Sequence, residues 1–172
     1  MFDLIKEEYS RYLLNSMEYQ KKIGKIKYPG LYLVTQINCN QKNYTVNKFS
    51  LPSLYEYKTC LDYFDSENGE IIINPEQFYK KFINGDFFNI YYSNNKFHAY
   101  SIEDYFILLN KNNRVFINVS IENIELGLNY NFEKIFIINY GDKKSIRNTY
   151  KNINKNKIIE IDNPKINPLN IL

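Results

Sequence analysis

Tryptophan is absent from this 172-residue chain, and alanine, histidine and arginine are scarce. Ala99 and His98 are the only residues of their kinds, and Cys39 and Cys60 are the only cysteines. One histidine and two distant cysteines exclude zinc sites of the CxxC and HExxH types. The six glycines are scattered, and none lies in a GxxxxGK[ST] or GxGxxG phosphate-binding pattern. The sequence therefore predicts no metal and no cofactor.

Long hydrophobic runs are also lacking. The longest apolar stretches, such as residues 105–109, are far shorter than the roughly 20 residues that cross a bilayer. Asp3 and Lys6 interrupt the start of the chain, where an export signal would be apolar. We therefore expect a cytoplasmic protein with no membrane partner and with both thiols reduced.

Asparagine, lysine, isoleucine, tyrosine and phenylalanine take the place of the scarce residues, with 17 Tyr and 12 Phe. Codons for these five residues are rich in A and T, so a low-GC genome explains their abundance. The number of tyrosines and lysines therefore carries no functional information, and only their placement does.

The balance of 44% hydrophobic and 24% charged residues is typical of a folded globular chain. We predict one α+β domain over residues 1–162 and an extended tail over 163–172, where two Asn-Pro pairs disfavour helix. The predicted architecture is a mainly antiparallel sheet of six to eight strands, packed by three or four helices. The oligomeric state stays open.

Local patterns predict the elements. An amphipathic N-terminal helix is indicated by apolar residues at helical spacing between Ile5 and Met17. Runs 31–37 and 44–50 read as a strand hairpin, whereas residues 51–69 are ambiguous. Asn74 followed by Pro75 is a strong helix start.

A second hairpin is predicted over residues 87–100, around a Ser93-Asn94-Asn95 tip. Both faces of this hairpin carry aromatic rings, so helices cover both faces or one face is an exposed interface patch. For the second alternative, the predicted protein-binding residues are Tyr91, Tyr92, Lys96, Phe97, His98 and Tyr100.

The net charge of +3 is unevenly distributed. Residues 1–30 and 142–172 are basic, and the middle of the chain is mildly acidic. Lysines beside tyrosines can neutralise phosphates and stack on bases, which nucleic-acid surfaces need. The predicted nucleic-acid-binding residues are Lys21, Lys22, Lys25, Lys27, Lys143, Lys144, Arg147 and Lys151.

Catalytic patterns are sparse. His98 is the only histidine that can act as a general base, and folding can bring it beside Cys39 or Cys60 to form a Cys–His pair. Glu56 and Lys58 have the E-x-K spacing of metal-dependent nucleases, without an upstream aspartate at a strand end. An acidic segment, Asp62, Asp65, Glu67 and Glu70, lacks the ligand spacing of a calcium loop.

These observations favour a non-catalytic binding module. We expect an inhibitor or immunity-type protein from a low-GC bacterium or its mobile elements, which occludes a protein or nucleoprotein partner. The alternative is a nucleic-acid-binding protein that uses its basic ends. The third hypothesis is a metal-dependent nuclease or another hydrolase with an unrecognised site.

Overall fold

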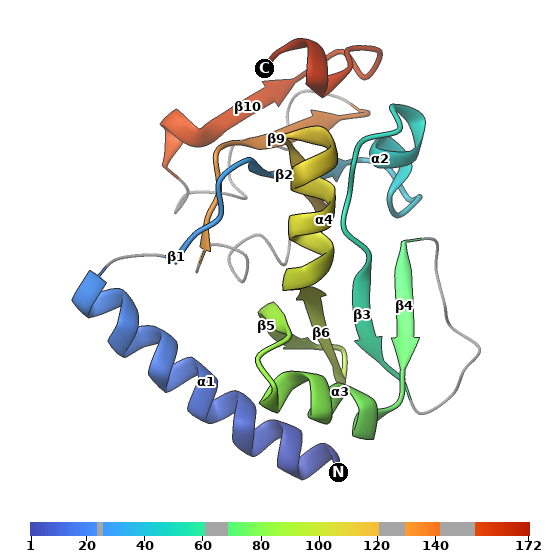
Figure 1. The fold of residues 1–172 in the computed structure, drawn as a ribbon. Coiled ribbons are helices and arrows are strands. Elements are labelled where there is room, and N and C mark those ends of the chain that lie inside the picture. Colours follow the sequence, from blue (N-terminus) through green and yellow to red (C-terminus); the bar gives the residue numbers. More distant parts are fainter. Residues whose placement is uncertain (24–25, 61–68, 121–129, 142–153) are drawn as a thin grey trace. The chain divides into compact units, whose positions relative to one another are not determined.

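A computed structural model describes residues 1–23, 26–60, 69–120, 130–141 and 154–172 (Figure 1). Contacts divide the chain into two compact units. Unit 1 comprises Met1–Ile26 and Tyr55–Ile107, and unit 2 comprises Lys27–Leu54 and Leu108–Leu172. Each unit is therefore built from two separate chain segments.

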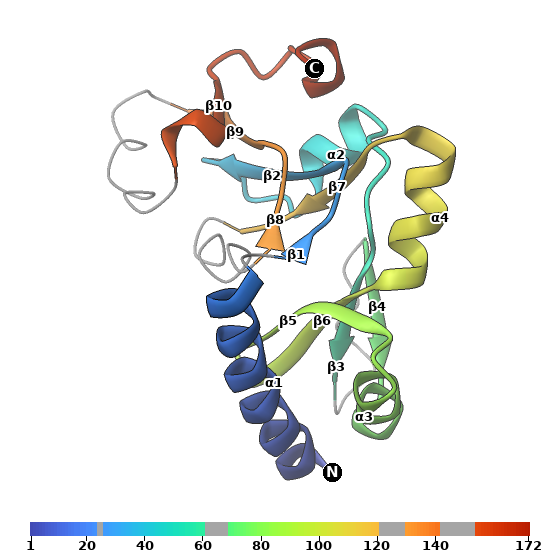
Figure 2. The same cartoon turned by 60° about the vertical axis from the view of Figure 1, so that its left-hand side comes forward.

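Unit 1 contains a four-stranded mixed sheet in the order β4-β3-β6-β5. Strand β3 pairs with β4 in parallel and with β6 antiparallel, and β6 pairs antiparallel with β5. The elements are α1 (Phe2–Ile23), β3 (Glu56–Thr59), β4 (Glu70–Ile73), α3 (Pro75–Ile83), β5 (Phe87–Ser93), β6 (Lys96–Ser101) and the first part of α4 (Ile102–Asn112). Figure 2 shows strands β3, β5 and β6 beside α3.

Helices α1 and α3 pack apolar residues against one face of this sheet. Ile5 and Phe78 are fully buried, in one cluster with Phe97 and Ala99 of β6. The Phe97 ring centroid lies 5.5 Å from that of Phe2 and 5.9 Å from that of Phe78. The first part of the predicted α1 stripe, which includes Ile5, Tyr9 and Tyr12, therefore faces the core, whereas Met17 at its end is 57% exposed.

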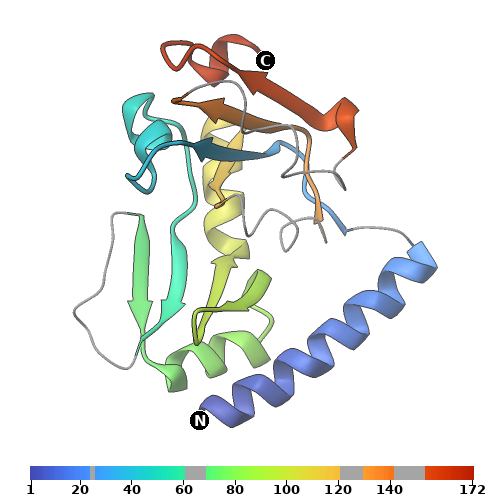
Figure 3. The same ribbon diagram turned by 180° about the vertical axis from the view of Figure 1, so that it is seen from behind.

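Unit 2 contains a four-stranded sheet in the order β10-β9-β2-β7, in which every described pairing is parallel (Figure 3). Its strands are β2 (Leu31–Ile37), β7 (Val115–Asn118), β9 (Ile135–Asn139) and β10 (Ile158–Ile161), and α2 (Tyr44–Lys48) follows β2. The shorter elements are β1 (Ile26–Lys27) at the unit boundary, β8 (Tyr130–Asn131) and the 3-10 turns Lys155–Lys157 and Pro168–Asn170. All five residues of β9 are buried, which explains why this strand shows no polar alternation.

The prediction of a mainly antiparallel sheet is wrong. The structure has a parallel sheet and a mixed sheet, so the chain belongs to the α/β class rather than to the predicted α+β class. The error begins at residues 44–50, which were expected to form a hairpin with 31–37. Residues 44–48 form helix α2 instead, because the buried side chain of Val46 packs in the unit 2 core. Tertiary packing there overrides the strand preference of β-branched residues.

Several local predictions are confirmed. Strands β5 and β6 form the expected hairpin, and Asn94 and Asn95 at its tip have positive φ angles of 50° and 59°. The predicted helix start at Asn74-Pro75 is the start of α3, and the Asn74 side chain accepts a hydrogen bond from the Gln77 N–H. The ambiguous segment 51–69 contains strand β3, and its residues 61–68 lie outside the described part.

The segment predicted to be an extended tail is anchored in unit 2. Pro168 is buried, and Leu169 packs against the core cluster that contains Ile161. A single domain over residues 1–162 stays a prediction. Within the described ranges, no helix combines the length and the apolar character needed to cross a membrane.

Candidate functional site

A polar pocket of about 250 Å3 lies in unit 2, at the ends of two neighbouring strands. Strands β2 and β7 pair in parallel, with Leu31 opposite Val115 and Val34 opposite Asn118, so their carboxyl ends share one edge of the sheet. The lining residues are Gln36, Cys39, Asn40, Lys42, Asn118, Val119 and Ser120. They lie at the carboxyl ends of β2 and β7 and in the loops that follow these strands.

The pocket lies beside the point where the strand order of the sheet reverses. Along the chain, the next strand of this sheet after β2 is β7, which pairs with one edge of β2, and the strand after that, β9, pairs with the other edge. The order therefore reverses between β2 and β9, whereas the pocket lies at the ends of β2 and β7. In open α/β sheets, ligands bind outside the carboxyl ends of the strands, and the pocket is at that edge of the sheet.

Asparagines shape the loop between β2 and α2. Asn38 and Asn43 have left-handed backbone conformations, with φ of 58° and 59°, which asparagine tolerates better than most residues. The Asn38 side chain donates a 3.0 Å hydrogen bond to the Asn139 side chain at the end of β9. This bond ties the loop to the neighbouring strand.

Gln36 fixes the other end of the same loop. Its Oε1 accepts 3.1 Å hydrogen bonds from both the backbone N–H and the hydroxyl of Thr45, and its Nε2 donates to the Gln41 carbonyl. Thr45 Oγ1 also lies 2.8 Å from the Tyr140 hydroxyl, and burial raises the pKa of Tyr140. The first turn of α2 is therefore already occupied by a side-chain oxygen.

Among the lining residues that the structure describes, Lys42 alone is a cation, and it is exposed. The amides of Asn40 and Asn118 and the hydroxyl of Ser120 complete a set of neutral donors and acceptors around it. Such a lining suits a small polar or anionic group better than an apolar ligand.

The predicted protein-binding residues lie mostly in the interior. Tyr91, Phe97, His98 and Tyr100 are at most 7% exposed. Strand β6 lies between β3 and β5, so it has no free sheet edge. Of the six predicted residues, only Tyr92 and Lys96 are partly exposed.

Three of these residues converge on Glu56 instead. The carboxylate accepts hydrogen bonds from the Tyr91 hydroxyl at 3.0 Å and the Tyr100 hydroxyl at 3.5 Å, and it contacts His98 Nδ1. Burial raises the pKa of Tyr100 well above its ordinary value, and the Glu56 carboxylate acts in the same direction. The hairpin thus supplies a buried polar cluster.

The E-x-K pattern does not form a nuclease site in the described part of unit 1. Lys58 pairs with Glu70 on β4 at 3.2 Å, which neutralises its charge. Among the residues that the structure describes, no group of three or more His, Cys, Asp or Glu side chains is placed to hold a metal. Asp62, Asp65 and Glu67 of the acidic segment lie outside the described residues.

The structure describes little of the basic ends. Lys21 is exposed on α1, and Lys22 and Lys27 belong to α1 and β1. The remaining predicted nucleic-acid contacts lie outside the described residues: Lys25, Lys143, Lys144, Arg147 and Lys151. The nucleic-acid hypothesis therefore stays a prediction.

Comparison with known proteins gives no family. No protein-family model and no curated protein matches the sequence. Among solved structures, the chain is similar to a guanylate kinase from Anaplasma phagocytophilum, at 12% identity and a TM-score of 0.46. The match covers 66% of this chain and 62% of that chain.

Sequence reasoning missed the pocket because it paired residues 31–37 with 44–50. A usable signal was present: polar residues follow two apolar runs, after Ile37 and after Ile117. If those runs are parallel neighbours, their polar ends meet at one sheet edge. Sequence alone did not indicate that they were parallel.

Proposed function

We propose that this chain is a binding protein whose unit 2 pocket takes a small phosphate-bearing ligand. The observation that carries the proposal is the position of Lys42, among amide and hydroxyl groups, at the carboxyl ends of β2 and β7. Ligand sites of α/β sheets occur at this edge.

The chemistry of the lining favours phosphate. A lysine ammonium binds phosphate as a point charge with three donors. Asn40, Asn118 and Ser120 supply further polar groups to the oxygens that the lysine does not reach. The pocket volume of about 250 Å3 is below the roughly 300–1,000 Å3 of sites for drug-sized molecules, so the proposed ligand is small or enters by one end.

Gln36 removes one backbone donor from the proposed anion contacts. Because its side-chain oxygen already accepts from the Thr45 backbone N–H, that amide is not presented to a ligand. The Thr45 amide is therefore not among the proposed contacts, and Lys42 contributes the dominant charge.

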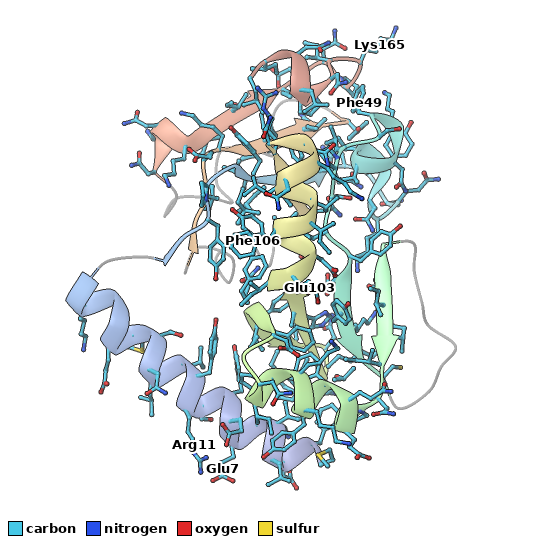
Figure 4. All side chains as sticks on the ribbon, viewed as in Figure 1. Glu7, Arg11, Phe49, Glu103, Phe106 and Lys165 are labelled. Carbon is cyan, nitrogen blue, oxygen red and sulfur yellow. The ribbon has the colours of Figure 1, made fainter. Side chains whose placement is uncertain are left out.

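A calorimetric titration tests this proposal. Inorganic phosphate and pyrophosphate are titrated at constant ionic strength, with acetate as the matched anion. We expect binding to weaken at least about tenfold in Lys42→Gln, since a hydrogen bond to a charged group contributes about 1.5–3 kcal/mol. Lys165→Gln is the control, because Lys165 is exposed in the same unit and is not a pocket residue (Figure 4). Equal affinities of the two variants, or no phosphate binding, would contradict the proposal.

The more specific hypothesis of an inhibitor or immunity-type protein remains a proposal about the partner. Its test is a pull-down from a low-GC bacterial lysate with and without nuclease, which separates a protein partner from a nucleoprotein. A cytoplasmic location also remains a prediction. Neither Cys39 nor Cys60 is in a disulfide in the structure.

A further inference from the structure

A second arrangement, in unit 1 and independent of the unit 2 pocket, brings a serine to the histidine of the Glu56 cluster. Ser93 ends strand β5, His98 lies in β6 and Glu56 begins β3. The register places Tyr91 opposite His98, and His98 opposite Lys58. Residues that pair across antiparallel strands project from the same face, so Glu56, two residues from Lys58, shares that face with His98.

The two ring nitrogens of His98 have different neighbours. Nδ1 contacts Glu56 Oε1, and Nε2 lies 3.3 Å from Ser93 Oγ. This order, hydroxyl to Nε2 and carboxylate to Nδ1, is the arrangement of nucleophile, base and orienting acid.

The surroundings hold the arrangement in place. The His98 ring stacks on the Tyr91 ring, with centroids 4.6 Å apart and planes within 2°. The Tyr91 hydroxyl donates to the same Glu56 oxygen at 3.0 Å. The His98 and Glu56 side chains are both buried, so protein rather than water orients them.

Ser93 itself is reachable from solvent. It is half-buried and adjoins Asn94 and Asn95, which are exposed at the hairpin tip. A small reagent can therefore approach its hydroxyl while the base stays buried. The five-residue spacing of Ser93 and His98 follows from the two-residue hairpin turn, so the pair is local, whereas Glu56 is brought from 42 residues away.

We propose that Ser93 is a nucleophile, activated by His98 and positioned through Glu56, that accepts the acyl group of small carboxylic esters. The carboxylate holds the His98 proton on Nδ1, which leaves the Nε2 lone pair for the serine hydroxyl. As Ser93 Oγ bonds to the ester carbonyl carbon, its proton passes to Nε2. The bond to the alcohol oxygen then breaks, and the leaving alcohol takes this proton.

The products of this half-reaction are acyl-Ser93 and a free alcohol. Water then attacks the acyl carbon, gives one proton to Nε2 and releases the carboxylic acid, and Nε2 returns the proton to Ser93 Oγ. Between these transfers, the protonated Nε2 has a second acceptor, the Ser93 carbonyl oxygen at 3.4 Å. The two half-reactions need no oxidant, metal or cofactor.

A fluorophosphonate probe tests the proposal on the full chain. The serine oxygen displaces fluoride from phosphorus, and mass spectrometry locates the modified residue. We expect labelling at Ser93, at least tenfold faster in the folded protein than in urea, and lost in Ser93→Ala. Ser10→Ala is the matched control, because Ser10 is exposed on α1 and its hydroxyl donates to the Lys6 carbonyl.

A second measurement separates activation from mere exposure. His98→Gln removes the base and is expected to slow labelling of Ser93 at least tenfold in variants shown by circular dichroism to be folded. If His98→Gln does not fold, the proposal is judged from the rates of Ser93 labelling in the folded wild type and in the wild type in urea. Absence of the probe from Ser93, or equal rates in the folded and denatured protein, would overturn the proposal. Phosphate binding in unit 2 is measured separately, so the two proposals fail independently.

Discussion

Buried polar side chains in unit 1 meet at one carboxylate. Tyr91, His98 and Tyr100 all contact Glu56, which is 6% exposed. Replacing the carboxylate leaves these groups buried beside a cavity, and each unsatisfied group costs about 1–3 kcal/mol. We expect Glu56→Ala to lower the free energy of unfolding by about 3 kcal/mol or more in urea titrations.

Glu76→Ala is the control for this substitution. Glu76 pairs with Lys80 at 2.9 Å, but both side chains are more than 60% exposed. An exposed pair of this kind contributes at most about 1 kcal/mol. Similar losses in both variants would show that the Glu56 cluster does not contribute as described.

Tyr12 predicts how stability responds to alkaline pH. Its ring packs at the unit 1 core beside Phe82, with centroids 5.9 Å apart, and burial raises the pKa of Tyr12 to about 12. The folded chain therefore holds this proton more tightly than the unfolded chain, whose tyrosine pKa is about 10. The contribution of Tyr12 is fully present below pH 10 and is lost as pH rises from about 10 to 12.

Ionisation of Tyr12 lowers the free energy of unfolding by up to about 1.4 kcal/mol per pH unit between pH 10 and 12. Denaturant titrations between pH 9 and 12 should show a shallower decline for Tyr12→Phe than for wild type. Tyr55→Phe, at a ring that is 55% exposed, is the comparison. The same decline in Tyr12→Phe and wild type would contradict the burial of the Tyr12 hydroxyl.

At the scale of elements, helix α3 depends on a local signal. The Asn74 side chain accepts a 2.8 Å hydrogen bond from the Gln77 backbone N–H, and Pro75 occupies the first turn. Loss of such a cap costs about 1 kcal/mol. We expect Asn74→Ala to reduce the urea midpoint accordingly, and Asn74→Ser, which restores an acceptor, to recover most of the loss. No effect in Asn74→Ala would mean that packing of Phe78 alone fixes the helix start.

The contrast between α3 and α2 shows what sequence can predict. Asn74 and Pro75 act on their own neighbours, and Gly85 ends the helix with a φ of 77°, so α3 was predictable. Helix α2 has no side-chain cap at Asn43 and depends on burial of Val46 in the unit 2 core. That contact is not visible in a local window, so its residues were predicted as a strand.

Strand pairing was less predictable for the same reason. The β5–β6 hairpin is closed by a short turn, and the asparagines of that turn predict it from the sequence. Strand β2, however, pairs with β7 and β9, which lie about 80–100 residues further along the chain. The pocket depends on those pairings, which is why its lining residues were absent from the predicted sites. The Glu56 cluster was missed because Glu56 and His98 meet only through β3–β6 pairing.

At the scale of the whole molecule, the two units interleave along the chain. Unit 1 and unit 2 each take one segment from the first third of the sequence and one from the remainder. No linker marks a boundary of this kind, so composition could not reveal it. Strand β2, which lies between β9 and β7 in the unit 2 sheet, belongs to the first of these segments.

A fragment of residues 108–172 should therefore fail to fold alone. It contains β7, β9 and β10 but lacks β2, so β7 has no neighbour in the described sheet. Circular dichroism and amide NMR dispersion of the fragment should show an unfolded chain, whereas the full chain is folded. A cooperative thermal transition in the isolated fragment would contradict the interleaved arrangement.

The most direct measurement of the central claim is an NMR titration of the full, isotope-labelled chain with inorganic phosphate. We predict saturable shifts of the amides of Asn40, Lys42 and Ser120 at phosphate concentrations up to about 10 mM, well above a millimolar Kd. Amides of the unit 1 sheet should stay unchanged, and the shifts should no longer saturate over this range in Lys42→Gln but should saturate as in the wild type in Lys165→Gln. Unsaturated shifts spread over exposed lysines, or none at the pocket, would contradict the account.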